Sequence, residues 1–356
     1  MESNLATILG CDIGGANTKV SLLRTTKGEV EEIRIASKYF PFWKRGEGGL
    51  VDVLVELRNE VAKDVEIDAI GLTMTAELSD FYETKRKGVD HILDQAEKTF
   101  RTTPIYVLDV EGGLKTVSEA RKEPLKTASS NWAATGWMVA RQIRNCLVID
   151  VGSTTTDIIP VADGEVVASG RNDLERLING ELVYTGALRT NVASIVERVP
   201  VRGQSARVSS EFFASTGDVH LVLGNIMRNE YTTETPDGRG KSRGEALARL
   251  ARVVCADSEL LSEGEVLEIA SYIYKKQVEQ IVDGIEQILD RTSLQFVEEI
   301  SAVVAGLGGK FLAERAARIA EIDHVFGLSG IVGFEASLEA PSAGVALMVA
   351  NRIEGV

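Results

Sequence analysis

Apolar residues recur along this chain with two different spacings, which predicts alternating helices and strands. They follow helical spacing over Gly49–Lys63 and over Ser271–Leu289, where one stripe contains Ile273, Val278, Ile281, Ile285 and Ile288. Short apolar runs typical of buried strands are Ile67–Leu72, Ile105–Leu108 and Glu299–Ala305, and further helices are predicted over Val89–Phe100, Ala128–Arg141 and Ser342–Asn351. The alternation favours an α/β fold.

A strand–turn–strand segment near the N-terminus is repeated in the middle of the chain. The first copy, Ile8–Val20, has an aspartate near the end of an apolar strand, then a Gly-rich turn and a second strand. The second copy, Val148–Ile159, follows at a constant offset, so that Asp12 matches Asp150, Gly14 matches Gly152 and Thr18 matches Thr156. Both copies continue through a turn into a third β-rich run, Val30–Ile35 and Glu165–Ala168. The repeat predicts a duplicated α/β domain.

The repeat also sets the expected domain boundaries. Residues 1–145 would form the first domain and residues 146–341 the second, with the C-terminal helix 342–356 returning to the first. The polar, Gly-rich segment 231–244 is the candidate for a mobile flap. A length of 356 residues suits two domains of ordinary size.

Each Gly-rich turn carries residues suited to binding a phosphate and a metal ion. Small residues let backbone N–H groups approach an anion, hydroxyl groups add donors, and Asp12 or Asp150 can hold Mg²⁺ that bridges to phosphate oxygens. The alternative for either turn is a tight β-hairpin that needs glycine for a positive φ, but two copies with aspartate in register favour the phosphate and metal site. The candidate anion-binding residues are Gly14, Gly15, Asn17, Thr18, Gly152, Ser153, Thr154, Thr155 and, in a third turn at Gly306–Lys310, Gly308 and Gly309.

The composition narrows the classes of function. Lys and Arg number 39 against 53 Asp and Glu, so the formal net charge is −14. Such acidity argues against a long phosphate-backbone interface, and we expect no nucleic-acid partner. No apolar run approaches a membrane span. Three cysteines without metal-ligand spacing predict neither a disulfide framework nor a metal site with cysteine ligands. We expect a cytoplasmic protein that does not bind a membrane. A homo-oligomer is compatible with the sequence.

The order of these elements resembles the actin, sugar-kinase and Hsp70 superfamily over the whole chain. In that superfamily two phosphate loops, a Gly-rich turn on the nucleotide side and two helices rich in small residues frame an interdomain cleft. The matching segments here are Asp12–Thr18, Asp150–Thr156, Gly306–Lys310, Ala128–Arg141 and Ser342–Asn351. The resemblance implies duplicated actin-like (ribonuclease H-like) α/β domains with a cleft between them.

Several strings are similar to a narrower group. Thr73–Leu78 with Glu83–Gly88, and also Gly152–Asp157, resemble the hydantoinase/oxoprolinase proteins. Within that group the chain is similar to the condensing enzymes of methanofuran biosynthesis, also called tetrahydromethanopterin-linked C1-transfer pathway proteins. The segments that carry this similarity are Tyr39–Lys44, Ser130–Trp132, Gly180–Gly186 with Arg189 and Thr190, and Asp237–Ser242.

The resemblance implies a transferase that forms an aryl–alkyl ether. An aminomethylfuran-methyl diphosphate would react with the phenol of γ-glutamyltyramine, and diphosphate would leave. Asp12 and Asp150 would carry Mg²⁺, and the two loops would cradle the diphosphate. Lys19 or Lys44 would add positive charge beside it.

Two other kinds of function stay open. The chain could be an ATP-dependent hydrolase of the hydantoinase or oxoprolinase type or a small-molecule kinase, each of which would consume ATP with a small acceptor. It could also be a regulatory module that closes around ATP without making a product. The first turn has Ala16 and Asn17 where phosphotransferases of this fold place a hydroxyl residue, which puts tight binding of an ATP γ-phosphate in doubt.

Two charged residues outside the turns are candidates for contact with a substrate. Glu77 lies in a turn after a predicted strand and could deprotonate a phenol as a catalytic base, or could be an acid at a helix N-terminus. Arg189 follows Tyr184 at a spacing that fits one helical face. It could pair with a substrate carboxylate, or form an ordinary ion pair.

Two short segments carry further candidates for substrate binding. Trp43 and Lys44 could stack on an aromatic substrate and reach its charges, or they could pack under a loop. Asn131 and Trp132 begin the first helix rich in small residues. Ser129, Ser130 or Asn131 could also be the N-cap of this helix.

Overall fold

The chain folds into two compact α/β units. The computed structural model describes residues 5–45, 48–63, 65–292 and 299–356. By their contacts, the segments of the first unit are Met1–Asn145, Ile159–Arg176 and Leu328–Val356, and those of the second are Cys146–Ile158 and Leu177–Gly327. The second unit is therefore shorter than the range 146–341 expected from the repeat, because the internal segment Ile159–Arg176 and the residues from Leu328 onward join the first unit.

The first unit contains a six-stranded sheet with the order β3-β2-β1-β4-β5-β6. Its strands are β1 (Ala6–Ile13), β2 (Asn17–Thr26), β3 (Glu29–Tyr39), β4 (Ala69–Met74), β5 (Ile105–Leu108) and β6 (Leu114–Thr116). β1, β2 and β3 form an antiparallel meander, whereas β4 runs parallel to both β1 and β5. Every residue of β1 and β4 is buried, as expected for parallel strands covered on both faces. Ile13 pairs with Met74, so the segments that follow β1 and β4 start at the same edge.

The first unit also contains helices, some of which cover the two faces of its sheet. They are α1 (Phe42–Arg45), α2 (Leu50–Ala62), α3 (Lys85–Thr99), α4 (Val117–Lys122), α5 (Pro124–Thr127), α6 (Asn131–Ala140), α12 (Ser329–Val332), α13 (Phe334–Leu338) and α14 (Ala340–Glu354), with the 3-10 turn η1 (Ala76–Leu78). Alternate residues of β1 point to the two faces: Leu9 and Cys11 join the core with α2 and α3, and Ile8 joins the core with α14.

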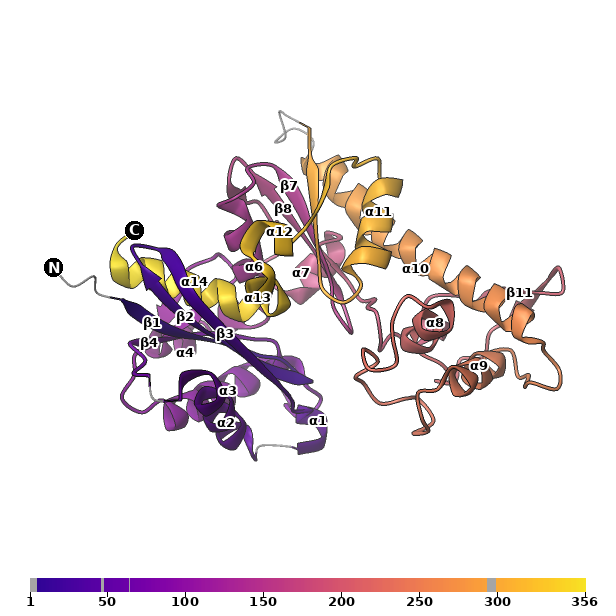
Figure 1. The fold of residues 1–356 in the computed structure, drawn as a ribbon, viewed down its shortest axis with the longest axis horizontal. Coiled ribbons are helices and arrows are strands. Elements are labelled where there is room, and N and C mark those ends of the chain that lie inside the picture. Colours follow the sequence, from indigo (N-terminus) through magenta and orange to yellow (C-terminus); the bar gives the residue numbers. More distant parts are fainter. Residues whose placement is uncertain (1–4, 46–47, 64, 293–298) are drawn as a thin grey trace. The chain divides into compact units, whose positions relative to one another are not determined.

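α14 lies along β1 and β2 and approaches β1 closely (Figure 1). A Cβ atom on Gly10 would lie 1.9 Å from the carbonyl oxygen of Ser342. The hydroxyl of Ser342 also lies 2.7 Å from the hydroxyl of Ser21 on β2. The C-terminal helix is therefore part of the core of the first unit.

A second six-stranded sheet has the order β10-β8-β7-β13-β14, with β9 paired to β8. Its strands are β7 (Cys146–Val151), β8 (Thr156–Ala162), β9 (Glu165–Val166), β10 (Leu182–Val183), β13 (Ser301–Ala305) and β14 (Val325–Gly327), and α7 (Asp173–Ile178) lies between β9 and β10 in the chain. β13 runs parallel to both β7 and β14. α10 (Glu263–Thr292) and α11 (Glu314–Ile319) share an apolar core with this sheet.

The second unit also contains a mainly helical region with its own core. Its elements are the turn η2 (Val192–Ser194), the hairpin β11 (Arg198–Val201) and β12 (Gln204–Arg207), α8 (Thr216–Leu223), α9 (Arg243–Arg252) and the first part of α10. The helical pattern predicted α10 only from Ser271 to Leu289. The helix begins earlier because Val266 and Ile269 pack into this separate core.

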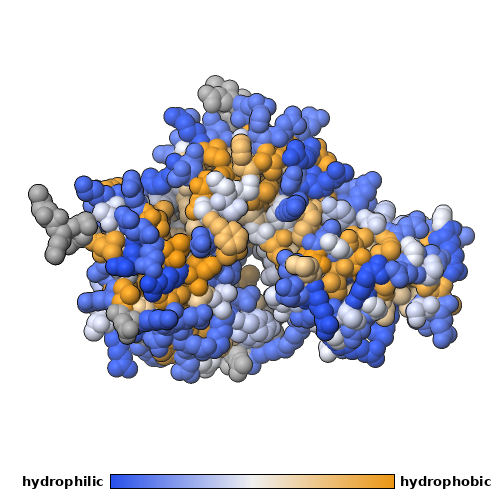
Figure 2. Space-filling model, in the orientation of Figure 1, coloured by the Kyte–Doolittle hydropathy of each residue, from blue (hydrophilic) through white to orange (hydrophobic). Residues whose placement is uncertain are grey.

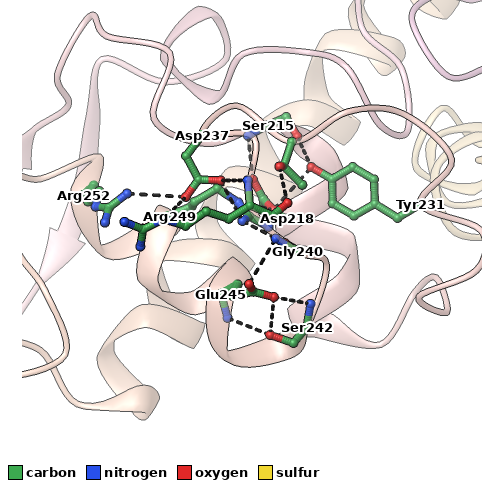
Figure 3. Close-up of polar contacts among 11 residues, drawn as sticks. Ser215, Asp218, Tyr231, Asp237, Gly240, Ser242, Glu245, Arg249 and Arg252 are labelled. Carbon is green, nitrogen blue, oxygen red and sulfur yellow. Dashed lines mark hydrogen bonds and ion pairs between the residues drawn. The ribbon is translucent and has the colours of Figure 1, made fainter.

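The segment 231–244, the candidate flap, is anchored to α8 and α9 (Figure 3). Arg249 of α9 donates two hydrogen bonds to Asp218 of α8, at 2.7 and 2.9 Å, and both side chains are fully buried. Arg249 also donates to Asp237 in the segment at 3.1 Å. At the start of the segment the hydroxyl of Tyr231 donates to Asp218 at 3.3 Å. One buried arginine thus ties the middle of the segment to both helices.

The surface is mixed in polarity. On the face drawn in Figure 2, hydrophilic residues surround smaller apolar areas. Large exposed apolar side chains include Leu174, Ile178 and Phe334. Within the described part of the chain, no helix has both the length and the apolar character needed to cross a membrane.

We expect Gly10→Ala to destabilise the first unit. The new Cβ would overlap a backbone carbonyl oxygen, which cannot turn aside as a flexible side chain can, so α14 would have to shift. Chemical denaturation should show a loss of about 1–3 kcal/mol or more in the free energy of unfolding. Gly15→Ala is the matched control, because no described atom lies within 4 Å of its Cβ position. Equal stability of the two variants would contradict the close packing of α14.

We expect Arg249→Met to lower the free energy of unfolding by about 3–5 kcal/mol, because Asp218 would stay buried without its charge partner. Chemical denaturation measures this loss. The double variant Arg249→Met with Asp218→Leu should recover much of it, since neither charge then remains buried. The exposed Arg239 offers a control in the same segment, and Arg239→Ala should change stability by about 0.5 kcal/mol or less. An Arg249→Met variant as stable as that control would show that the anchor is dispensable.

Candidate functional site

The first Gly-rich turn connects β1 to β2 at the carboxyl end of β1. A backbone hydrogen bond of 3.0 Å from the N–H of Gly14 to the carbonyl of Asn17 closes it. Asp12, one residue before the end of β1, is 4% exposed, and Thr18 is fully buried. No described atom lies within 4 Å of the Cβ position of Gly15, so the backbone there is open. The turn offers a carboxylate beside a backbone that a ligand can approach.

The basic residues predicted near this turn lie in different surroundings. Lys19 pairs with Glu339 at 2.8 Å. Lys44 is exposed in α1, and α1 starts beside the turn because the N–H of Phe42 donates to the carbonyl of Gly15 at 3.1 Å. The side chain of Trp43, the neighbour of Lys44, lies outside the described part of the chain. The segment proposed to bind substrate is therefore adjacent to the first turn.

Glu77 follows β4 in η1 and is buried. The N–H of Thr75 donates to the carbonyl of Ile13 at 2.9 Å, which places this segment next to the first Gly-rich turn. The side chain of Glu77 is 1% exposed, and burial raises its pKa to about 7. Its Oε2 atom has no hydrogen-bond partner among the described residues. A carboxyl group that titrates near neutral pH suits acid–base catalysis.

Ser129 connects Glu77 to an ion pair. Its hydroxyl lies 2.7 Å from Oε1 of Glu77 and 2.7 Å from Oδ2 of Asp173 on α7. Asp173 in turn pairs with Lys85 of α3 at 2.5 Å. All four residues belong to the first unit. The fold thus gathers two carboxylates, a hydroxyl and an ammonium group from four different segments.

The start of α6 carries Asn131 and Trp132 in different roles. Oδ1 of Asn131 accepts a hydrogen bond of 2.9 Å from the N–H of Trp132. Trp132 is 2% exposed, and the guanidinium of Arg176, equally buried, lies 4.2 Å from the centre of its ring. Ser130 is the residue before the helix, and its hydroxyl donates to the carbonyl of Leu108 at 3.0 Å. Of the three residues predicted as the N-cap, Ser130 occupies that position, although its side chain makes no capping hydrogen bond.

The second Gly-rich turn repeats the geometry of the first. The N–H of Gly152 donates to the carbonyl of Thr155 at 2.9 Å, and Asp150 lies one residue before the end of β7. Ser153 and Thr154 are half-buried, with their hydroxyl groups 3.5 Å apart. The duplication predicted from the sequence is therefore confirmed at the level of single hydrogen bonds.

The loop after β10 lies against this second turn. The N–H groups of Leu188 and Arg189 both donate to the carbonyl of Ser153 at 3.0 Å. The guanidinium of Arg189 lies 3.4 Å from the hydroxyl of Thr154. The helical face assumed for Tyr184 and Arg189 is wrong, because these bonds to the turn shape the backbone into a loop. Arg189 nevertheless reaches the second Gly-rich turn.

A buried histidine supports the same loop. Nε2 of His220 lies 2.9 Å from Oε1 of Gln277, whose amide nitrogen donates to the carbonyl of Gly186 at 2.9 Å. Because the glutamine oxygen accepts, Nε2 of His220 carries the proton. Burial lowers the pKa of His220 to about 4, so the ring stays neutral. A neutral network thus holds the loop in place.

The third Gly-rich turn lies against the end of β7. Gly306 follows β13, the parallel neighbour of β7, and adopts a φ of 76°. A Cβ atom there would lie 2.4 Å from Oδ1 of Asp150, so only glycine fits this close approach. The N–H of Gly308 donates to the carbonyl of Val151 at 2.9 Å, and the π-helical turn η3 (Gly309–Ala313) leads into α11. The predicted anion-binding residues of the second unit therefore meet around Asp150.

Each of the two Gly-rich turns offers one carboxylate of the kind that can hold a magnesium ion together with a phosphorylated ligand. Residues 5–45, 48–63, 65–292 and 299–356 contain no group of three or more His, Cys, Asp or Glu that could hold a metal. Each unit instead provides one aspartate at a Gly-rich turn, Asp12 or Asp150. Mg²⁺ is usually held by one or two carboxylates, with waters and phosphate oxygens as its other ligands. This donor set suits Mg²⁺ carried by a phosphorylated ligand better than a permanent metal centre.

Sequence reasoning missed Lys85, Asp173 and Arg176. Lys85 lies within the string Glu83–Gly88 that carried the family resemblance, but its partner is 88 residues away. Arg176 follows on the same short helix as Asp173 and contacts a tryptophan of α6. No periodicity links such distant residues, so only the fold identifies them.

Comparisons with known proteins give the same family as the motifs. The family described as Hydantoinase/oxoprolinase matches residues 68–352. A relative from Methanocaldococcus jannaschii, the (4-{4-[2-(gamma-L-glutamylamino)ethyl]phenoxymethyl}furan-2-yl)methanamine synthase, is 40% identical over 348 residues, which cover 98% of each chain. A protein of the same name from Methanococcus vannielii is 34% identical over 212 residues, or 59% of this chain and 93% of the relative.

A solved structure supports the fold. The nucleotide-free structure of acetone carboxylase, an enzyme of ATP-dependent acetone carboxylation, is 12% identical with a TM-score of 0.52, and the match covers 95% of this chain and 70% of that one. At this identity the likeness concerns the fold alone, and the duplicated actin-like α/β fold expected from the sequence is confirmed. With matches over most of its length, the chain belongs to the hydantoinase/oxoprolinase family and, within it, to the furan-2-yl-methanamine synthases.

Proposed function

We propose that this enzyme joins an aminomethylfuran-methyl diphosphate to the phenol oxygen of γ-glutamyltyramine and releases diphosphate, as a step of methanofuran biosynthesis. The name of the two relatives describes a furan methanamine with a phenoxymethyl group, which is the ether that this reaction would make. The observation that carries the proposal is the 40% identity to one of these relatives across 98% of both chains.

The Gly-rich turns would hold the diphosphate. They present backbone N–H groups at the ends of β1 and β7, and the second turn adds the hydroxyl groups of Ser153, Thr154 and Thr155. Arg189, which lies beside Thr154, would add a positive charge. Negative charge grows on the diphosphate as its bond to carbon breaks, so donors that are already in place lower the barrier.

Asp12 and Asp150 would hold Mg²⁺ with the diphosphate. Bound there, the ion would neutralise part of the charge on the leaving group. Each aspartate lies near the end of a strand, beside a turn proposed to bind the diphosphate. Neither carboxylate would need a further protein ligand, because waters and phosphate oxygens complete the shell.

The remaining candidates would act on the organic parts of the substrates. Glu77, whose segment lies beside the first turn, would receive the phenol proton. The segment with Trp43 and Lys44 begins at the same turn, and Asn131 and Trp132 lie at the start of α6. Trp43, Lys44 and Asn131 would bind the aromatic rings and charges of the two substrates, whereas Trp132, buried against Arg176, would support that part of the site.

We expect the purified protein to form the ether and diphosphate in equal amounts from the two substrates and Mg²⁺ in the absence of ATP. Mass spectrometry of the product and an assay of released diphosphate measure both. Asp12→Asn and Asp150→Asn should each lower kcat/KM by about 10²–10³-fold, the usual cost of losing one preorganised electrostatic contact. Asp163→Asn, an exposed position on the β8–β9 turn, is the control and should keep full activity.

Turnover that appears only when ATP is added would contradict this proposal. It would favour a kinase or an ATP-dependent hydrolase of the hydantoinase or oxoprolinase type. ATP binding with a conformational change but without any product would favour a regulatory module instead.

A further inference from the structure

The hydroxyl of Ser129 lies between two carboxylates, and this arrangement limits how protons are distributed. Its distances of 2.7 Å to Oε1 of Glu77 and 2.7 Å to Oδ2 of Asp173 are both hydrogen-bond distances. A serine hydroxyl donates one hydrogen, and ionised carboxylates only accept. Ser129 cannot donate to two ionised carboxylates at once, and its oxygen also accepts a hydrogen bond of 3.4 Å from Nζ of Lys85. A proton on either carboxyl group would satisfy both contacts of 2.7 Å. The geometry therefore fits two carboxylates that share one added proton.

The chain of contacts runs from the interior to the surface of the first unit. Glu77 is 1% exposed, whereas the side chains of Lys85 and Asp173 are 24% and 17% exposed. The charged groups that act on Glu77 are Lys85 from α3, which favours its ionised form, and Asp173 from α7, which opposes it. Burial dominates and raises the pKa of Glu77 to about 7. The buried carboxyl group of Glu77 can thus take up a proton near neutral pH, and the partly exposed carboxylate of Asp173 can contact a ligand.

The backbone holds Ser129 in this position at some cost. Its φ of 52° lies in the left-handed region, which costs a residue other than glycine about 1 kcal/mol or more. The next residue, Ser130, is fixed by contacts of its hydroxyl with the carbonyl of Leu108 and the hydroxyl of Thr73, both at 3.0 Å. The left-handed φ of Ser129 and the hydrogen bonds of Ser130 therefore hold the hydroxyl of Ser129 between the two carboxylates.

We propose that Glu77, Ser129 and Asp173 act as one proton acceptor, in which Asp173 meets the phenol and Glu77 stores the proton. This inference rests on the proposed function, because it assigns the group that deprotonates the phenol. Asp173 would contact the phenol, and its connection through Ser129 to the buried Glu77 gives the proton a second acceptor.

The steps balance in protons and electrons. The O–H bond of the phenol breaks, and the phenol oxygen forms a bond to the methyl carbon of the furan. The bond between that carbon and diphosphate breaks, and diphosphate leaves with the electron pair. The proton passes to Asp173, and Ser129 gives its own proton to Glu77 while it takes the one from Asp173. At the end Asp173 is a carboxylate again and Glu77 is a neutral acid.

The first experiment measures the protonation of Glu77 without turnover. Infrared spectra recorded across neutral pH follow protonated carboxyl groups, and Glu77→Gln identifies the band of Glu77. Asp173→Asn removes a negative charge and should lower the titration midpoint, whereas Lys85→Met removes a positive charge and should raise it, each by about one pH unit. Lys87→Met, an exposed position on the same helix, is the control and should leave the midpoint unchanged.

The second experiment measures the pH dependence of kcat/KM for ether formation. The acceptor must be unprotonated to take a proton, so activity of the unmodified enzyme should fall as the pH drops through about 7. In Lys85→Met this fall should move to higher pH, as the infrared midpoint does. Ser129→Ala and Ser129→Gly both cut the connection and should lower kcat/KM by about 10²-fold. Glycine suits the positive φ, so an equal loss in both variants does not come from backbone strain.

The outcomes separate this inference from the proposed function. Midpoints that stay unchanged in both Asp173→Asn and Lys85→Met would overturn the shared proton. Full activity of both Ser129 variants would overturn the transfer through the serine. If the unmodified protein makes no ether but the infrared midpoints shift in opposite directions, the shared proton stands and the proposed function fails.

Discussion

One backbone hydrogen bond in each unit fixes the geometry around its candidate site. It runs from a glycine two residues after an aspartate to the carbonyl three residues further on, from Gly14 to Asn17 and from Gly152 to Thr155. The bond reverses the chain directly after a buried strand. Each aspartate therefore lies at the carboxyl end of its strand, next to the turn. The turn must remain narrow for this, and a narrow turn is built from small residues whose backbone an anion can approach.

The strand parallel to each aspartate strand supplies the second part of each half-site. In the first unit Ile13 pairs with Met74, and the segment after β4 brings Glu77. In the second unit Asp150 pairs with Ala305, and the segment after β13 is the third Gly-rich turn. At the equivalent place in the topology, the first unit has the buried carboxyl group of Glu77, and the second unit has the backbone of Gly306 packed against Asp150. The two copies have kept the fold and diverged in chemistry.

Features that depend on sequence neighbours could be predicted, and features that depend on distant partners could not. The strand Ile105–Leu108 agrees with β5, and the helix Gly49–Lys63 agrees with α2 to within one residue at each end, because a local pattern decides both. The turns around the two aspartates follow from short motifs for the same reason. In contrast, the spacing that suggested a helical Arg189 is outweighed by backbone bonds to the second turn, and the pairing of Lys85 with Asp173 spans 88 residues.

The close contact between Gly10 and Ser342 has a consequence for biosynthesis. The ribosome makes β1 before the second unit and α14 after it, so one face of the first sheet lacks its cover until the second unit has been made. Apolar side chains such as Ile8 and Leu23 stay accessible while the whole second unit is made, and surfaces of this kind promote aggregation in nascent chains. The first unit begins before the second and finishes after it, so its folding depends on protection of that face during synthesis.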